Sequence, residues 1–232
     1  MSARISRSLL DPLLTGPLRQ IYRWIPIPAG LPPEAIVACG HLAAIAGAVG
    51  FAYSGRSAWG GVAAALGVAL NHTCDVLDGT HARATGQCRN GGELLDHFVD
   101  PLSFCYWVAG LSFSAVPATT WAPWIGMAGV IVIYAMAVLT NIRAKMIGEF
   151  TLARFGPTEF KTLLILFGCV QAWIVSSGTT ALGPPATVAL WFLGGMTVAG
   201  VLQLLRSLWR AVRDVNAVSA SKPDTTEWLS EA

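Results

Sequence analysis

Two intervals of this chain contain no charged residue over lengths that a soluble fold rarely needs. Residues 101–142 and residues 162–205 lack Asp, Glu, Lys and Arg over 42 and 44 positions. A helix of the shorter length would extend about 63 Å, enough to cross a hydrocarbon core of about 30 Å twice. Each interval also contains a proline-bearing break, near residues 114–124 and 176–185. Each therefore predicts two transmembrane helices.

Two more uncharged stretches precede these intervals. Residues 35–55 are uncharged over 21 positions and residues 57–74 over 18 positions. Only 12% of the chain is charged, about half the share that is usual in soluble domains. The sequence therefore predicts an all-α integral membrane protein with six transmembrane helices, which form a membrane domain over residues 28–214.

The two ends of the chain differ from this domain. In residues 1–27, arginines alternate with apolar and aromatic residues, which is typical of an amphipathic helix lying at a membrane interface. A cap that packs on the protein itself is the alternative for this segment. Residues 215–232 are small, polar and acidic, and are predicted to form a disordered cytoplasmic tail.

The distribution of basic residues predicts the orientation. With six spans, both termini and the loops near residues 83–92 and 143–161 share one side, and that side carries 14 of the 15 Lys and Arg residues. Arg56 alone lies on the other side. The positive-inside rule then makes the termini cytoplasmic, in a multi-pass protein of the inner or plasma membrane.

Four aspartates flank the loop at residues 83–92. They are Asp75, Asp78, Asp96 and Asp100. Helical residues three or four positions apart share a face, so each pair predicts a carboxylate stripe. Clustered carboxylates repel one another unless protons or cations compensate them, and their hard oxygens suit Mg²⁺, Mn²⁺ or Ca²⁺. Gly79 and Gly92 lie on the acidic faces, which indicates that a bulky group approaches the backbone there.

These residues fit one spaced pattern, D-x2-D-G-x2-A-R-x8-G-x3-D-x3-D. It is met without a gap by Asp75, Asp78, Gly79, Ala82, Arg83, Gly92, Asp96 and Asp100. The pattern resembles that of the CDP-alcohol phosphotransferases, six-helix membrane enzymes of phospholipid synthesis. The resemblance implies transfer of a substituted phosphate group from a CDP-alcohol to a hydroxyl acceptor, with release of CMP.

The resemblance also implies roles for the residues of the pattern. Asp75, Asp78 and Asp96 would hold two divalent ions, Mg²⁺ or Mn²⁺, and Asp100 would be a further ligand, the general base, or both. The CDP-binding residues would be Asp75, Gly79, Ala82, Arg83 and Gly92. An interfacial arginine that extends toward lipid headgroups is the alternative for Arg83.

His97 is a second candidate for the general base. The run Gly92 to His97, GELLDH, resembles the branch of the family that uses CDP-choline and CDP-ethanolamine. A histidine can act as a base near neutral pH. A helix-packing histidine is the alternative.

The loop predicted between the fourth and fifth spans carries candidate acceptor-binding residues. They are Arg143, Lys145, Arg154 and Glu159, and the same charged stretch ends with Lys161. Ordinary positive-inside charges are the alternative. Gly156 and Pro157 predict the start of the next helix, with Glu159 near the positive end of its dipole.

The donor and the acceptor stay open at this point. CDP-diacylglycerol or a CDP-aminoalcohol would be the donor, and glycerol phosphate, inositol phosphate, serine or diacylglycerol the acceptor. The Asn and Thr that many family members carry near the start of the first span are absent from Pro33-Glu34-Ala35-Ile36. We expect a homodimer in the lipid bilayer and no nucleic-acid partner. A membrane transport protein with a cation site and a non-catalytic nucleotide-binding relative are the alternative functions.

Overall fold

The computed structural model describes residues 3–6, 8–152, 155–179 and 181–218. The elements in chain order are β1 (Ala3–Ser6), α1 (Asp11–Ile21), α2 (Pro33–Tyr53), α3 (Ala58–Thr85), α4 (Asn90–Ala115), α5 (Ala122–Ile147), β2 (Glu149–Leu152), α6 (Pro157–Ser177) and α7 (Pro185–Val218). The predicted helical fold is confirmed, and two four-residue strands are added to it.

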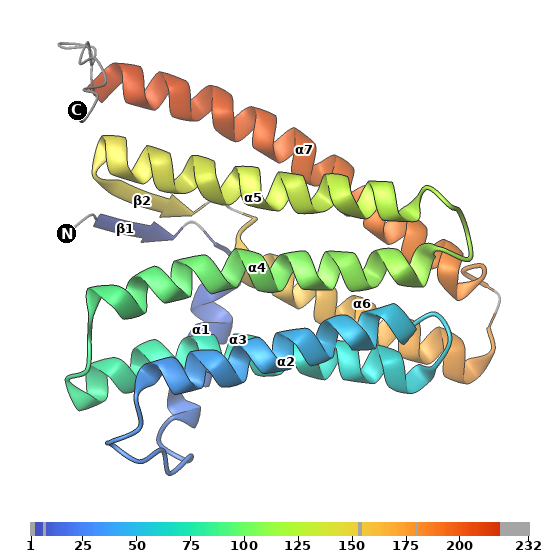
Figure 1. Ribbon diagram of the computed structural model, residues 1–232, viewed down its shortest axis with the longest axis horizontal. Helices are drawn as coiled ribbons and strands as arrows, with labels where there is room; N and C mark the ends of the chain where they lie inside the picture. The colour runs from blue at the N-terminus through green and yellow to red at the C-terminus, as the bar shows by residue number, and fades with distance from the viewer. Residues whose placement is uncertain (1–2, 7, 153–154, 180, 219–232) are drawn as a thin grey trace, which may run out of the picture.

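Six long helices, α2 to α7, form one bundle (Figure 1). Five of them, α2, α3, α5, α6 and α7, are long and apolar enough to cross a membrane by length and composition. Helix α4 is not among these five, and its first half carries Asp96 and Asp100. The sixth span and the interfacial position of α1 therefore stay predictions.

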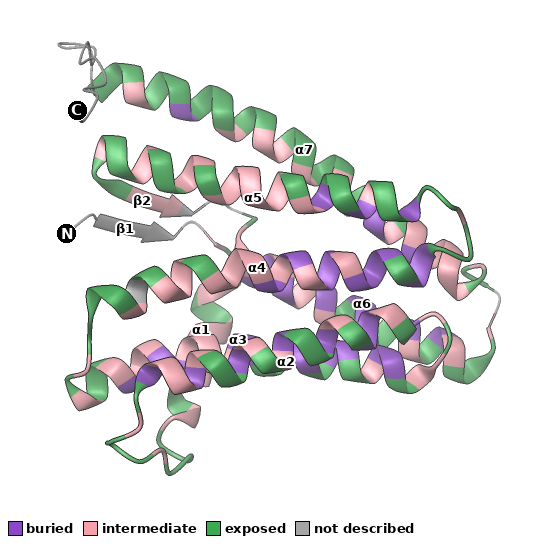
Figure 2. Cartoon of the chain, in the orientation of Figure 1, coloured by how far each residue is buried: buried purple, intermediate pink, exposed green. Residues whose placement is uncertain are grey.

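The interior of the bundle is narrow, whereas its outer surface is strongly apolar. Trp107 is fully buried at the centre and donates a hydrogen bond of 2.9 Å from Nε1 to the carbonyl oxygen of Ala44. Purple buried turns concentrate where α3, α4 and α6 face the interior, and green exposed turns dominate α7 (Figure 2). Large apolar side chains such as Leu66, Ile131 and Trp191 are more than half exposed. Exposed apolar surface on this scale is typical of a lipid-facing protein.

Glycines bring α2, α3 and α4 into backbone contact. A Cβ atom built on Gly67 of α3 would lie 2.4 Å from the Cα atom of Gly47 in α2. A Cβ atom on Gly110 of α4 would lie 2.1 Å from the carbonyl oxygen of Ala48 in α2. Neither position has room for a methyl group, so close approach of these helices depends on glycine.

The N-terminal segment is attached to the bundle by polar contacts. β1 pairs in parallel with β2, so that Ala3 lies opposite Glu149; the sequence had predicted only helix in this region. The hydroxyl of Tyr22 and Nδ1 of His81 in α3 lie 2.9 Å apart. His81 Nε2 lies 2.8 Å from the carbonyl oxygen of Leu31, so this carbonyl accepts the Nε2 proton and Nδ1 accepts the Tyr22 hydroxyl.

The predicted start of α6 is confirmed, and it contributes to this attachment. Pro157 is the first helical residue, and the Glu159 carboxylate accepts the N–H of Gly156 at 2.9 Å. Glu159 also accepts hydrogen bonds from the Ser8 hydroxyl at 2.6 Å and from the N–H of Leu9 at 2.8 Å. At the other end of the chain, α7 continues to Val218, into the segment predicted to be a disordered tail. The rest of that predicted tail lies outside the described residues.

The backbone contact at Gly110 predicts a stability effect. We expect Gly110→Ala to lower the free energy of unfolding by about 1–3 kcal/mol, because the new methyl group must separate α4 from α2. Thermal unfolding of the detergent-purified protein measures the effect. The control is Gly16→Ala in α1, where the added Cβ meets no heavy atom within 4 Å. Equal melting temperatures for the Gly110 variant and the unmodified protein would contradict the predicted contact.

Candidate metal and substrate site

Three of the four predicted aspartates converge in space. One carboxylate oxygen each from Asp75 of α3 and from Asp96 and Asp100 of α4 lies within 4.8 Å of the others. The two helices are joined by a short loop, and Gly86 ends α3 in the left-handed conformation with φ of 70°. The spacing predicted a carboxylate stripe on each helix, and the structure brings Asp75 of one stripe next to both aspartates of the other.

Asp78 lies in the same region and is outside that group of three. It is buried on α3, one turn after Asp75, and its carboxylate accepts the N–H of Gly79. Its role as a metal ligand stays a prediction.

A buried lysine joins the carboxylates. Nζ of Lys161 on α6 lies 2.6 Å from Oδ2 of Asp75 and 3.1 Å from Oδ1 of Asp100. The residue is fully buried, and its ammonium lies 5.6 Å from the centre of the Phe104 ring. The sequence had placed Lys161 at the end of a charged loop, but it is the fifth residue of α6 and points into the bundle. The signal that could have located it was the helix start predicted at Pro157.

A buried histidine borders the same cluster. Nδ1 of His72 lies 3.9 Å from Oδ2 of Asp75, one helical turn away on α3. Neither ring nitrogen has a hydrogen-bond partner among the described residues. Such a polar group in an apolar interior is costly unless a ligand or water completes it. No sequence pattern indicated a partner for His72.

The residues expected to bind CDP lie around the ends of α3 and α4. The guanidinium of Arg83 folds back along α3, and its Nη1 would lie 3.2 Å from a Cβ atom on Gly79. A Cβ atom on Gly92 would lie 4.0 Å from Oε1 of Glu34, at the start of α2. Oε2 of Glu34 also accepts a hydrogen bond of 2.9 Å from Nη2 of Arg89, with which it forms an ion pair. The Arg83 guanidinium thus lies over Gly79, whereas the space beside Gly92 is open as far as Glu34. The CDP contacts themselves stay predictions.

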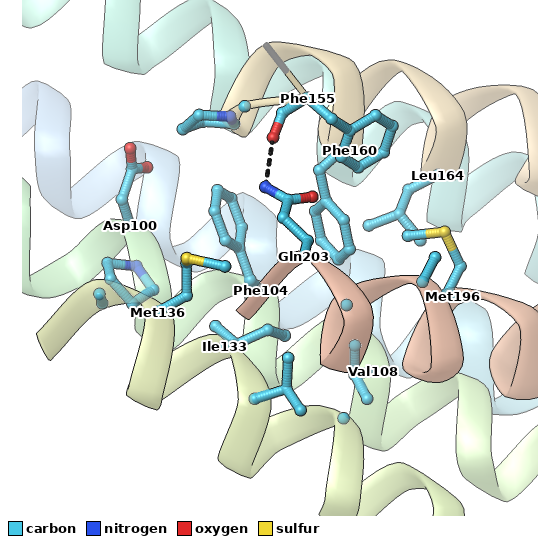
Figure 3. Close-up of a pocket in the computed structure, with 18 of the residues that line it drawn as sticks. Asp100, Phe104, Val108, Ile133, Met136, Phe155, Phe160, Leu164, Met196 and Gln203 are labelled. Carbon is cyan, nitrogen blue, oxygen red and sulfur yellow. Dashed lines mark hydrogen bonds between the residues drawn. The ribbon is translucent and has the colours of Figure 1, made fainter. Parts of the chain in front are cut away.

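An apolar cavity of about 830 Å³ borders the carboxylates and lies among α4, α5, α6 and α7 (Figure 3). Asp96, His97 and Asp100 contribute to its wall, and the rest is mainly aliphatic and aromatic, including Phe104 and Phe160. His97 also contacts Phe150 of β2, with 4.9 Å between the ring centres. Its position on the cavity wall is compatible with a base, and the ring contact with Phe150 is compatible with packing.

A second cavity, of about 810 Å³, adjoins the first and is basic. Its lining includes Arg143, Arg206 and Arg210, with Asp214 as the counter-charge. The two cavities share the residues Met136, Thr140, Phe155 and Gln203. Gln203 donates a hydrogen bond of 2.9 Å from Nε2 to the carbonyl oxygen of Phe155, drawn as the dashed line in Figure 3. Arg206 and Arg210 were not singled out from the sequence, because they fall near the end of an otherwise apolar helix.

The predicted acceptor-binding residues have different surroundings. Arg143 lines the basic cavity and pairs with Asp214 at 2.8 Å. Lys145 is exposed near the end of α5, and Arg154 lies outside the described residues. Glu159 is buried and accepts the hydrogen bonds that hold the N-terminal segment. An acceptor-binding role for Lys145, Arg154 and Glu159 stays a prediction.

The donor set fits a hard divalent cation. The group of three offers only carboxylate oxygens, the ligands that Mg²⁺ and Mn²⁺ prefer. The oxygens lie close enough for one ion to contact several of them or for two ions to be bridged. Asp75, Asp96 and Asp100 are thus the residues that could hold the metal.

Comparisons with known proteins agree with this geometry. The sequence profile of the CDP-alcohol phosphatidyltransferase family matches residues 35–198. The chain is 27% identical to human cholinephosphotransferase 1 over 206 residues, which is 82% of this chain and 48% of the human protein. It is 27% identical over 202 residues to the phosphatidylinositol phosphate synthase of Mycolicibacterium smegmatis, covering 86% of this chain and 88% of that protein.

A third relative is the CDP-diacylglycerol–serine O-phosphatidyltransferase of Encephalitozoon cuniculi, 31% identical over 144 residues, or 57% of this chain and 35% of that protein. The chain thus spans 48% of the length of the human protein and 35% of the length of the Encephalitozoon cuniculi protein. The matched region runs from α2 into α7 and includes every residue of the aspartate pattern. The chain belongs to the CDP-alcohol phosphatidyltransferase family.

Proposed function

We propose that this chain is a membrane enzyme that transfers a substituted phosphate group from a CDP-alcohol to a hydroxyl acceptor. The convergence of Asp75, Asp96 and Asp100 beside a large apolar cavity is the observation that carries the proposal. Asp78 completes the proposed ligand set for two Mg²⁺ or Mn²⁺ ions. When bound, such ions would neutralise the pyrophosphate of the donor and hold the reacting oxygens in line.

The residues around the site supply the remaining functions. Gly79, Ala82, Gly92 and Arg83 are the proposed contacts of the CDP group, with Arg83 as a multidentate phosphate ligand. The acceptor oxygen attacks phosphorus, the bond from phosphorus to the CMP oxygen breaks, and CMP leaves. The proton of the acceptor hydroxyl passes to Asp100 or His97, both of which lie on the cavity wall.

The two cavities favour a lipid donor and a phosphorylated acceptor. The lining of the 830 Å³ cavity suits acyl chains, which points to CDP-diacylglycerol as the donor. The basic cavity brings three arginines together with one aspartate, and arginine is well suited to bind phosphate. We therefore propose a phosphoalcohol, such as glycerol phosphate or inositol phosphate, as the acceptor. Diacylglycerol as acceptor and a CDP-aminoalcohol as donor form the second candidate, supported by the place of His97 on the apolar wall.

The proposed setting follows from the sequence. The charge distribution favours both termini and the aspartates on the cytoplasmic side of the inner or plasma membrane. Association into a homodimer is part of the same proposal.

The reaction class is tested by CMP release. We expect purified protein in lipid vesicles to release CMP from CDP-diacylglycerol only when Mg²⁺ or Mn²⁺ and an acceptor are present. Asp100→Asn should lower the rate by about 10²–10⁴-fold, since a metal ligand or general base is lost. Metal binding without CMP release, across all donors and acceptors named above, would instead favour a transport protein or a non-catalytic relative.

The base is tested by His97→Gln. If His97 accepts the hydroxyl proton, we expect kcat to fall about 10²–10⁴-fold while the dissociation constant for CDP is unchanged. A kcat within two-fold of the unmodified protein would assign the proton to Asp100.

The phosphoalcohol acceptor is tested by Arg206→Gln. Loss of one charged phosphate contact should raise the KM for glycerol phosphate or inositol phosphate about ten-fold and leave the KM for CDP-diacylglycerol unchanged. Arg213→Gln is the matched control, because Arg213 lies two turns further along α7 and stacks at 4.7 Å on Trp209. Equal acceptor KM values for both variants would argue for diacylglycerol as the acceptor.

A further inference from the structure

Lys161 is a positive charge enclosed by the bundle and shared between two of the proposed metal ligands. Its Nζ atom contacts one oxygen of Asp75 and one oxygen of Asp100, which belong to different helices. Its side chain is 1% exposed, so water contributes little to its solvation. The two carboxylates and the ring of Phe104 are thus the groups that stabilise the ammonium.

The same carboxylates cannot serve an ammonium and a metal ion without cost to both. Asp75 and Asp100 each belong to the group of three whose oxygens lie within 4.8 Å of one another. A divalent ion bound there lies within a few ångströms of Nζ. Two positive charges at such a distance repel strongly in an environment of low polarity. The ammonium and the metal ion would also compete for the same lone pairs of the carboxylate oxygens.

We propose that Lys161 is a resident counter-ion of the aspartate cluster that competes with the divalent metals. Its ammonium stabilises the carboxylates when metal is absent and weakens metal binding when metal arrives. Lys161 is therefore a positioning residue that links α6 to α3 and α4. This inference rests on the proposed metal site but goes beyond it, because it concerns how tightly that site binds its ions.

The variant Lys161→Met tests the proposal, since methionine is similar in length and uncharged. The full-length protein in detergent is titrated with Mn²⁺ by calorimetry, and its thermal unfolding is followed in EDTA and in saturating Mn²⁺. We expect the dissociation constant for Mn²⁺ to fall about ten-fold or more, because a nearby positive charge is removed. We also expect the melting temperature to fall in EDTA and to recover in Mn²⁺.

Two further variants make the outcome decisive. Lys161→Arg keeps the charge and should keep both the Mn²⁺ affinity and the melting temperature in EDTA close to those of the unmodified protein. Arg56→Met removes an exposed positive charge at the opposite end of the bundle and should change neither quantity.

The inference is overturned if Lys161→Met binds Mn²⁺ as the unmodified protein does, or more weakly. A second uncharged variant, Lys161→Gln, serves as a check on Lys161→Met. The inference is also overturned if both variants stay unfolded in saturating Mn²⁺, because the bound metal is expected to neutralise the carboxylates that have lost the ammonium. Weaker CDP or acceptor binding with unchanged Mn²⁺ affinity would assign Lys161 to the substrate instead. If the unmodified protein binds no Mn²⁺, it is the proposed metal-dependent function that fails.

Discussion

Carboxylates inside an apolar helical bundle are the constraint on which this structure depends. The side chains of Asp75 and Asp100 are about a quarter exposed, and carboxylates whose oxygens lie within 4.8 Å of one another repel unless cations compensate them, which is a cost to the folded state. The ion pairs of Lys161 with Asp75 and Asp100 offset part of it and connect α6 to both aspartate-bearing helices. Lys161 is the fully buried partner, and leaving its ammonium without a carboxylate would cost about 3–5 kcal/mol. The ion pairs that stabilise the site therefore also hold α6 against the two aspartate-bearing helices.

Backbone contacts between helices position this site. Gly47 and Gly67 let α2 and α3 touch, and Gly110 lets α4 reach α2. Helices α3 and α4 are thus both fixed against α2, which sets how far apart their carboxylates lie. Lipid offers little hydrophobic driving force for helices to associate, so such close packing contributes much of the association energy. Small residues far from the carboxylates therefore determine the geometry of the carboxylates.

The sequence predicted the parts of the molecule that follow from local rules. Charge-free lengths predicted the long helices, and spacings of three and four residues predicted a carboxylate stripe on each of two helices. Pro157 predicted the start of α6. These features depend on helix geometry within single segments.

What the sequence did not predict depends on contacts between distant segments. Lys161 faces Asp75 only because α6 packs against α3, 86 residues away along the chain. The pairing of β1 with β2 and the hydrogen bond from Ser8 to Glu159 join segments about 150 residues apart. The basic cavity forms because α5 and α7 lie together, which brings Arg143 close to Arg206 and Arg210. The residue pattern of a single segment does not predict such contacts between distant segments.

The two adjoining cavities would open the site to the proposed substrates from two different phases, the bilayer and the aqueous solution. Gln203 and Phe155 line both cavities and are joined by a hydrogen bond, so a polar contact lies where the apolar and basic surfaces meet. The proposed lipid donor of the apolar cavity would arrive by diffusion within the bilayer, and its availability would be a mole fraction of the membrane. The proposed phosphoalcohol acceptor of the basic cavity would arrive from water, and its availability would be a molar concentration. Diluting the bilayer with inert lipid would then lower the supply of the donor alone, while diluting the aqueous phase would lower the supply of the acceptor alone.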